Sequence, residues 1–217
     1  MATVEHLVFN HYEENTYIVY DETLSAVVID PGMGDARQYD SFESFISKHA
    51  LSIEKILLTH THVDHIAGLG RIYAAHHVPV FLHADACEIL RQSEIYASVM
   101  GFDIGSIEDI PFTTVSDCEI IPFGNNQMEA RLVPGHAAGS LVFCLHSEKT
   151  VFTGDALFNN SIGRTDLPTG NYSQLMQNLR AKVISLPDDY TVFPGHGPKT
   201  TIGSEKIHNP FLNPSVY

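Results

Sequence analysis

The chain has 217 residues, of which 44% are hydrophobic and 18% are charged. These proportions are those of an ordinary globular protein, and the length allows one large domain with a sizeable core. The formal net charge of −14, with histidine counted as neutral, argues against nucleic acid and anionic membranes as partners, because both bind clustered lysine and arginine.

The first half of the chain predicts alternating strands and helices. Residues 16–20 and 26–29 are rich in β-branched and aromatic residues, and a D-P-G turn ends the second run. Asp35 is the expected N-cap of a helix, and Gln38 three residues later completes a capping-box pattern. Further elements are expected at residues 53–58 (strand), 66–76 (helix), 79–82 (strand) and 84–92 (helix).

The second half repeats this order loosely. Strands are expected at residues 119–122, 128–133, 141–145, 151–153 and 191–193, and a helix at 172–186. Residues 94–115 read as a long loop with some helix. No proline- or serine-rich linker divides the chain, so we expect one domain over residues 1–217, and strand clusters with intervening helices favour a layered α/β arrangement.

Cysteine usage and the N-terminus bear on the compartment. Cys87, Cys118 and Cys144 are far apart and form no C-x-x-C pair, so we expect buried small hydrophobic residues rather than disulfides or a thiolate zinc site. The first residues lack the basic region and apolar stretch of a signal peptide, and no window approaches the ~18 apolar residues of a membrane span. We therefore expect a cytoplasmic protein.

A crowded histidine motif follows the strand expected at residues 53–58. Residues 59–65 read T-H-T-H-V-D-H, with three histidines and one aspartate within six residues. Such crowding has no use in a core, whereas imidazole and carboxylate groups are metal ligands. Three later strand ends each add one residue of this kind directly after a glycine, namely His136, Asp155 and His196. Loops at strand ends are where α/β proteins place their sites, so we expect these residues to meet.

Seven residues are too many for one tetrahedral ion. They are His60, His62, Asp64, His65, His136, Asp155 and His196. Imidazole and carboxylate together suit zinc, iron or manganese rather than calcium. A catalytic zinc takes about three protein ligands, whereas two ions that share one carboxylate use all seven and lie ~3.5–4 Å apart. We expect two divalent metal ions, with zinc as the first choice and iron or manganese as alternatives.

Four segments resemble the metallo-β-lactamase superfamily in their order and surroundings. They are T-H-x-H-x-D-H, P-G-H-x-x-G-S, F-T-G-D-x-L-F and F-P-G-H-G, and Asp30-Pro31-Gly32 matches the same pattern. Residues 161–168 and 194–211 resemble the glyoxalase II-like (hydroxyacylglutathione hydrolase-like) enzymes of the short bacterial type. The resemblance covers nearly the whole chain and implies an αββα sandwich with the metal site at one edge.

The resemblance also implies a role for each residue. His60, His62 and His136 would hold the first ion, Asp64, His65 and His196 the second, and Asp155 would bridge them. Asp64 would in addition have a catalytic role, orienting a metal-bridging hydroxide that attacks a thioester carbonyl. The implied substrate is a small-molecule thioester such as S-lactoylglutathione or a related 2-hydroxyacyl thiol, while the oligomeric state is left open.

One departure concerns glutathione. Only 21 residues follow His196 (217 − 196 = 21), too few for the C-terminal helical domain with which glyoxalase II proper binds glutathione, so we expect that domain to be lacking. Arg164 and Lys199 are candidates for holding an acidic end of the substrate. For Arg164 the alternative is an ion pair with Asp166 that braces its loop.

Rival functions remain open within the same superfamily. A mononuclear iron persulfide dioxygenase would use His60, His136 and Asp155, because a facial triad with open positions suits oxygen activation. A lactamase is disfavoured, because many lactamases carry a cysteine at the place of Asp155 and are exported, and we expect neither feature here. An RNA-processing nuclease is disfavoured by the net charge of −14, and a metal-binding protein without turnover is disfavoured by the complete set of seven residues.

Overall fold

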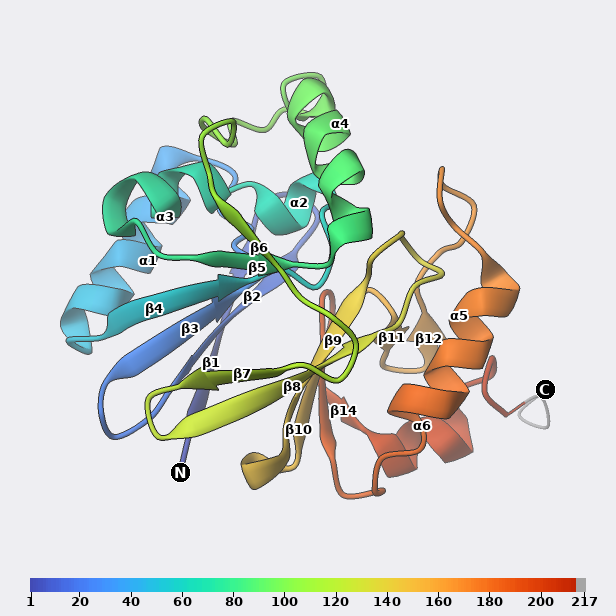
Figure 1. Ribbon diagram of the computed structural model, residues 1–217. Coiled ribbons are helices and arrows are strands. Elements are labelled where there is room, and N and C mark those ends of the chain that lie inside the picture. Colours follow the sequence, from blue (N-terminus) through green and yellow to red (C-terminus); the bar gives the residue numbers. More distant parts are fainter. Residues whose placement is uncertain (214–217) are drawn as a thin grey trace.

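Two six-stranded sheets lie face to face with helices on both outer sides (Figure 1). The computed structural model describes residues 1–213. The first sheet has the strand order β1-β2-β3-β4-β5-β6. Its strands are β1 (Thr3–Phe9), β2 (Glu14–Tyr20), β3 (Ser25–Ile29), β4 (Ser52–Leu57), β5 (Val80–Leu82) and β6 (Phe112–Thr114). Strands β3 to β6 pair in parallel, which sends their carboxyl ends to one edge.

The second sheet has the order β14-β13-β10-β9-β8-β7. Its strands are β7 (Ile120–Phe123), β8 (Asn126–Leu132), β9 (Leu141–Leu145), β10 (Thr150–Gly154), β13 (Thr191–Pro194) and β14 (Thr200–Thr201). Within it β10 and β13 are parallel neighbours. A small hairpin of β11 (Leu157–Phe158) and β12 (Ser161–Ile162) follows β10.

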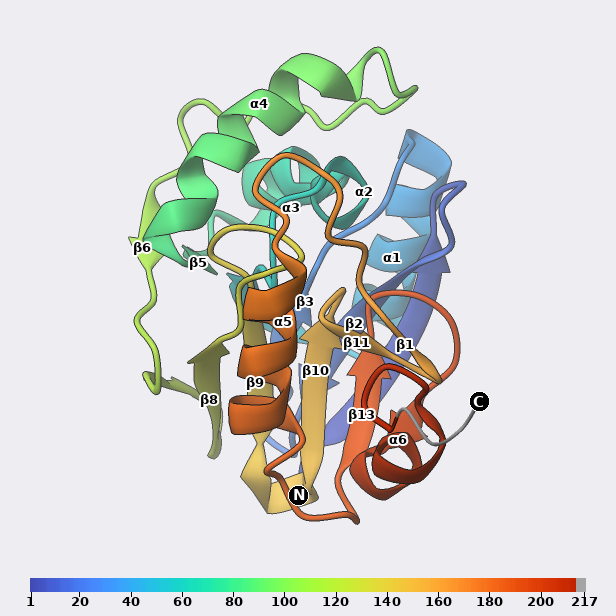
Figure 2. The same ribbon diagram turned by 90° about the vertical axis from the view of Figure 1, so that its right-hand side faces the viewer.

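Helices cover the outer faces of both sheets (Figures 1 and 2). The helices beside the first sheet are α1 (Ala36–Lys48), α2 (Val63–Ile66), α3 (Leu69–His76) and α4 (Cys87–Ala97). Those beside the second are α5 (Tyr172–Asn178), continued by the π-helical segment η3 (Leu179–Val183), and α6 (Ile202–His208). Short 3₁₀ turns are η1 (Ala84–Ala86) and η2 (His146–Glu148).

The core lies in three layers that follow this stacking. Between the sheets, Tyr17 and Leu57 from the first meet Phe143 and Phe152 from the second, and all four are nearly inaccessible to water. A second apolar cluster lies between the first sheet and α1, α3 and α4, and a third between the second sheet and α5. This architecture confirms the layered α/β fold, with the two sheets flanked by helices, that the sequence predicted.

The element predictions failed in a few places. The helix expected at residues 66–76 is interrupted between Ile66 and Leu69, where the Gly68 N–H donates to the Pro31 carbonyl at 2.8 Å. Residues 94–115, expected as a long loop with some helix, do include the end of α4 up to Ala97, but they also contain the unpredicted strand β6. Strands β1, β6 and β14 and helix α6 were not predicted, since they are short or only partly buried and carry a weak apolar pattern.

The cysteines only partly match the prediction of burial. Cys144 is buried, whereas Cys87 is half-buried and Cys118 is exposed in a turn with a φ of 62°. All three are free thiols. The burial prediction is therefore wrong for Cys118.

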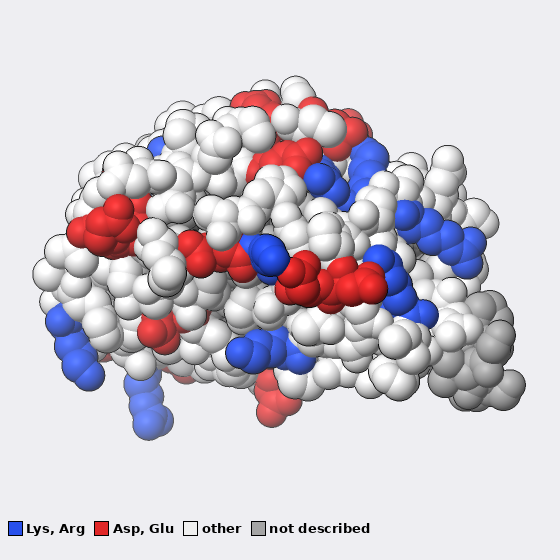
Figure 3. Space-filling model, turned by 90° about the horizontal axis from the view of Figure 1, so that it is seen from below, with Lys and Arg blue, Asp and Glu red and all other residues white. Residues whose placement is uncertain are grey.

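Surface charge and helix length complete the description. On the face seen from below, acidic and basic side chains lie next to one another (Figure 3). Ion pairs such as Lys206–Asp188 and Lys182–Asp117, each at 2.6 Å, join opposite charges. Within residues 1–213, no helix is both long and apolar enough to cross a membrane.

Candidate metal centre

The seven predicted residues come together at one edge of the sandwich, on loops from both sheets. His60 follows β4 of the first sheet, and His62 is the N-cap of α2, which carries Asp64 and His65. From the second sheet, His136 follows β8, Asp155 follows β10 and His196 follows β13. The loops are joined directly, since the Gly195 N–H donates to the Gly154 carbonyl and Asn15 of β2 donates to the Gly195 carbonyl, each at 2.8 Å.

Two groups of three residues face one another across this edge. In the first, ligand atoms of His60, His62 and His136 lie within 4.8 Å of one another. His136 Nε2 is 3.0 Å from His62 Nδ1. In the second, Asp64, His65 and His196 meet the same limit, and His196 Nε2 is 3.2 Å from both His65 Nε2 and Asp64 Oδ2.

Asp155 lies between the two groups. Its Oδ1 is 3.3 Å from His65 Nε2, and its Oδ2 is 3.7 Å from His136 Nε2 and 3.6 Å from His196 Nε2. The carboxylate thus reaches one histidine of the first group and two of the second. This is the position that a bridging ligand requires.

The residues fit divalent cations by two further observations. His60 Nε2 is buried without a hydrogen-bond partner, and Asp155 Oδ1 approaches His65 without hydrogen-bond geometry. Buried polar atoms are nearly always satisfied, and a cation among these nitrogen and oxygen atoms satisfies them together. Because the donors are imidazole and carboxylate, the site suits zinc, iron or manganese.

Outer contacts fix how several imidazoles are oriented. His136 Nδ1 donates to the Arg164 carbonyl at 2.8 Å, and His196 Nδ1 donates to the Tyr12 carbonyl at 2.9 Å. These bonds leave Nε2 of both rings facing the site, as metal-binding histidines require. Sequence reasoning did not find these carbonyls, because a backbone acceptor leaves no signature in residue type.

Asp30 is a further residue whose role the sequence did not reveal. Its Oδ2 lies 3.0 Å from His65 Nδ1, and its Oδ1 accepts from the Thr59 N–H at 2.7 Å. Asp30 has a φ of 50°, unusual for a residue other than glycine. The D-P-G motif was the available signal, and it marks the residue that connects β3 to the histidine loop.

Protonation in the site follows burial and mutual charge. Burial, with the nearby His136, lowers the pKa of His62 to about 4, and burial with neighbouring imidazoles lowers the pKa of His60. Burial alone would raise the pKa of Asp155, but the charge of His65 outweighs it and holds that pKa well below its usual range. Burial alone would lower the pKa of His65 and His196, but the carboxylates of Asp155 and Asp64 outweigh it and raise both. His60, His62 and Asp155 are thus in the protonation form that binds metal, neutral imidazole and ionised carboxylate.

A cleft of about 660 Å³ opens over the centre. Five of the seven residues form its floor, namely His62, Asp64, His136, Asp155 and His196. In Figure 2, α4 lies across the top of the molecule and the loop before α5 rises toward it. The centre is thus accessible to a small molecule.

The two candidate substrate contacts differ. Arg164 lines the cleft, but its guanidinium donates two hydrogen bonds to Asp166, both at 2.8 Å. Lys199 lies over the Phe193 ring, 5.9 Å from its centre, and does not line the cleft. The substrate roles of both residues stay predictions.

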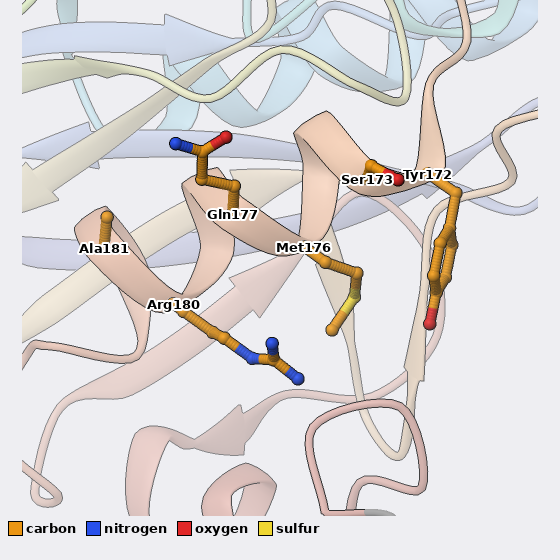
Figure 4. Close-up of a pocket in the computed structure, with 6 residues that line it drawn as sticks. All are labelled: Tyr172, Ser173, Met176, Gln177, Arg180 and Ala181. Atoms are coloured by element: carbon orange, nitrogen blue, oxygen red, sulfur yellow. The ribbon is translucent and has the colours of Figure 1, made fainter.

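Two other features have no connection to the seven residues. A hollow on the outer face of α5 is lined by Tyr172, Ser173, Met176, Gln177, Arg180 and Ala181 (Figure 4). Glu129, Cys144 and His146 also bring ligand atoms within 4.8 Å of one another. There Glu129 pairs with Arg131 at 2.8 Å and with His146 at 2.6 Å, so this cluster is an ion-pair network.

Comparisons with known proteins agree on the family and differ on the reaction. The model of the metallo-beta-lactamase superfamily matches residues 12–196. The chain is 33% identical over 204 residues to hydroxyacylglutathione hydrolase GloC of Haemophilus influenzae, covering 93% of this chain and 94% of the relative.

Solved structures share the fold, and two of them match nearly the full length of this chain. The crystal structure of BLEG-1 B3 metallo-beta-lactamase is 29% identical with a TM-score of 0.85, covering 97% of this chain and 100% of that one. That of TTHA1623 in a di-iron-bound form is 31% identical with a TM-score of 0.85, covering 96% and 100%. With the family model spanning the His/Asp cluster, the chain belongs to the metallo-β-lactamase superfamily and is a metal-dependent hydrolase.

Proposed function

We propose that the protein hydrolyses small-molecule thioesters at two divalent metal ions. The observation that supports two ions is the place of Asp155, whose carboxylate oxygens lie 3.3–3.7 Å from histidines of both groups. The observation that supports a thioester is the likeness to hydroxyacylglutathione hydrolase over nearly the full length of both chains. We assign His60, His62 and His136 to one ion, Asp64, His65 and His196 to the other, and Asp155 to both.

The chemistry divides between the ions and the chain. When bound, a pair of divalent ions lowers the pKa of water and polarises a carbonyl oxygen. The chain holds neutral imidazoles at His60 and His62, since burial lowers both pKa values. Asp64 lines the floor of the cleft, where its ionised carboxylate can accept a hydrogen bond from an O–H group and so orient that oxygen toward the substrate.

Hydrolysis of a thioester needs no further acid. The carbonyl carbon gains a bond to the oxygen of water and loses its bond to sulfur, which leaves a carboxylic acid and a thiol. A thiol has a pKa near ~8.5, so sulfur leaves readily as the thiolate and takes a proton from solvent. No serine or cysteine nucleophile is required.

The first experiment is metal content per chain together with S-lactoylglutathione hydrolysis on the same sample, purified without chelator. About two ions with turnover is the expected result, with zinc as the first choice and iron or manganese as alternatives. About one iron without hydrolysis would instead favour the persulfide dioxygenase, with His60, His136 and Asp155 as its triad.

A β-lactam belongs in the same assay, because BLEG-1 is named a B3 metallo-beta-lactamase and shares this fold. We expect thioester turnover to exceed β-lactam turnover. The opposite order, at full metal content, contradicts the proposed function.

A further inference from the structure

The cleft over the metal centre has two apolar walls. Ile89, Tyr96 and Met100 form one wall, and their spacing of seven and four residues is that of one helix face on α4 and the turn after it. Leu167 and Pro168, on the loop before α5 that rises toward α4 in Figure 2, form the other wall, and Phe158 lines the cleft beside His196. Tyr96 is 59% exposed and Leu167 is 36% exposed, so both walls present large apolar groups to the open cleft.

The wall on α4 is attached to the metal-binding loop. Ser93 Oγ donates to the Thr61 carbonyl at 2.6 Å, and Thr61 Oγ1 donates to the Ala86 carbonyl at 3.1 Å. Thr61 stands between His60 and His62 in the sequence. Because the same residue holds the helix and separates two metal-site histidines, the apolar wall has a defined position relative to the reacting centre.

The cleft offers little to an anionic substrate arm. Arg164 is the one Lys or Arg among the described residues that line the cleft. Its guanidinium already donates two hydrogen bonds to the Asp166 carboxylate. The chain as a whole carries a formal charge of −14. A carboxylate brought between the apolar side chains would lose hydration and would have to compete with Asp166 for Arg164, and glutathione carries two carboxylates.

We infer that the site selects thioesters with an apolar acyl group, aliphatic or aromatic, and an uncharged thiol part over thioesters of glutathione. The inference rests on the thioesterase activity proposed above and narrows its substrate class. The volume of about 660 Å³ is ample for such a ligand. In this arrangement the thioester carbonyl lies on the floor of the cleft beside Asp64 and Asp155, and the acyl group extends between Tyr96 and Leu167.

A matrix of four substrates tests this selection. The acyl group is lactoyl or hexanoyl, and the thiol is glutathione or the uncharged N-acetylcysteamine. We expect kcat/KM for hexanoyl-N-acetylcysteamine to exceed that for S-lactoylglutathione by at least ~10-fold, the scale on which apolar pockets discriminate. S-lactoylglutathione as the best of the four would overturn the inference while supporting the thioesterase. No turnover of any, at full metal content, would overturn both.

Variants of the walls make the test specific to the cleft. Tyr96→Ala and Leu167→Ala should each lower the hexanoyl-to-lactoyl ratio of kcat/KM by about 10-fold, mainly through KM. The matched control is Ile95→Ala, since Ile95 is 71% exposed on α4 beside Tyr96 but does not line the cleft. An unchanged ratio in both wall variants, or an equal fall in the control, would overturn the assignment of these walls to the substrate arm.

Discussion

At the scale of single residues, Asp155 connects the two halves of the candidate metal centre. Its carboxylate lies within 3.7 Å of nitrogen atoms from His65, His136 and His196. Residue type predicted its participation and the family resemblance implied a bridging role, and its place between the two groups depends on where two loops meet. The position of this carboxylate between the two groups is therefore a property of the folded chain.

Replacing Asp155 should remove one ion. We expect Asp155→Ala to bind about one ion per chain instead of two, since the shared ligand is lost. Elemental analysis after dialysis measures this, with Asp166→Ala as the control, because Asp166 is an exposed carboxylate that pairs with Arg164 on a nearby loop. Two tightly held ions in Asp155→Ala would contradict the dinuclear assignment.

The glycines before the metal-site residues act in two ways. Gly135 and Gly154 have φ values of 136° and 47°, which favour glycine. Gly195 is needed for close approach instead, since a Cβ there would lie 2.6 Å from His65 Cε1 and would also meet Asp155. A glycine at each of these three positions therefore has a structural reason.

We therefore expect Gly195→Ala to displace His65 or Asp155 and to lower metal content and turnover together. Overpacking of this kind costs about 1–3 kcal/mol of folding free energy. Gly197→Ala is the matched control, because Gly197 is in the same loop with a φ of 72° and open space around it. Equal losses in both variants would mean that any side chain in this loop disturbs the site, so the clash with His65 and Asp155 would not be the cause.

At the scale of elements, the interior of most strands and helices followed from local pattern. Asp35 caps α1 as predicted, accepting from the Gln38 N–H at 2.8 Å. The other half of the capping box did not form, because the Gln38 side chain accepts from the Gly34 and Asn10 N–H groups instead. A tertiary contact thus replaced a local one.

Asp21, in the turn after β2, ties the first sheet to the β7–β8 hairpin of the second. It accepts from the Thr23 N–H at 2.9 Å, the Asn125 N–H at 2.7 Å and Asn126 Nδ2 at 2.8 Å. Burial alone would raise the pKa of Asp21, but these hydrogen bonds, with that of the Thr23 hydroxyl first, lower it to about 2.

A carboxyl with a lowered folded-state pKa stabilises the fold above its unfolded pKa of ~3.9, and this stability is lost as pH falls through the folded value. We expect Asp21→Asn to lower the free energy of unfolding by about 1–2 kcal/mol at pH 7. The difference from the parent should shrink between pH 4 and pH 2. Urea unfolding of both proteins at each pH measures it, and a difference that does not change with pH would exclude the ionised carboxylate as its cause.

At the scale of the whole molecule, the metal centre joins the two sheets. His60 and the α2 residues come from the first sheet's side, while His136, Asp155 and His196 follow strands of the second. An ion that binds only this folded arrangement stabilises it by mass action, by about 2.7 kcal/mol when its free concentration is ~100 times the dissociation constant.

Chelation should therefore lower the melting temperature by several degrees, and added metal should restore it. Differential scanning calorimetry of the parent before and after chelation measures the shift. Asp155→Ala, which should hold fewer ions, is expected to shift less. An equal shift in both proteins would mean that the chelator acts elsewhere.

The sequence by itself determined the superfamily, the layered α/β class and the seven candidate residues, because those depend on residue type and local spacing. The tertiary structure decided that Asp155 lies between the two groups of histidines and which backbone carbonyls orient the rings. It also decided that α4 and the loop around Leu167 form the walls of the cleft. These depend on contacts between segments up to about 180 residues apart, as from Asn15 to Gly197, and such contacts arise from packing of the whole chain rather than from any local pattern.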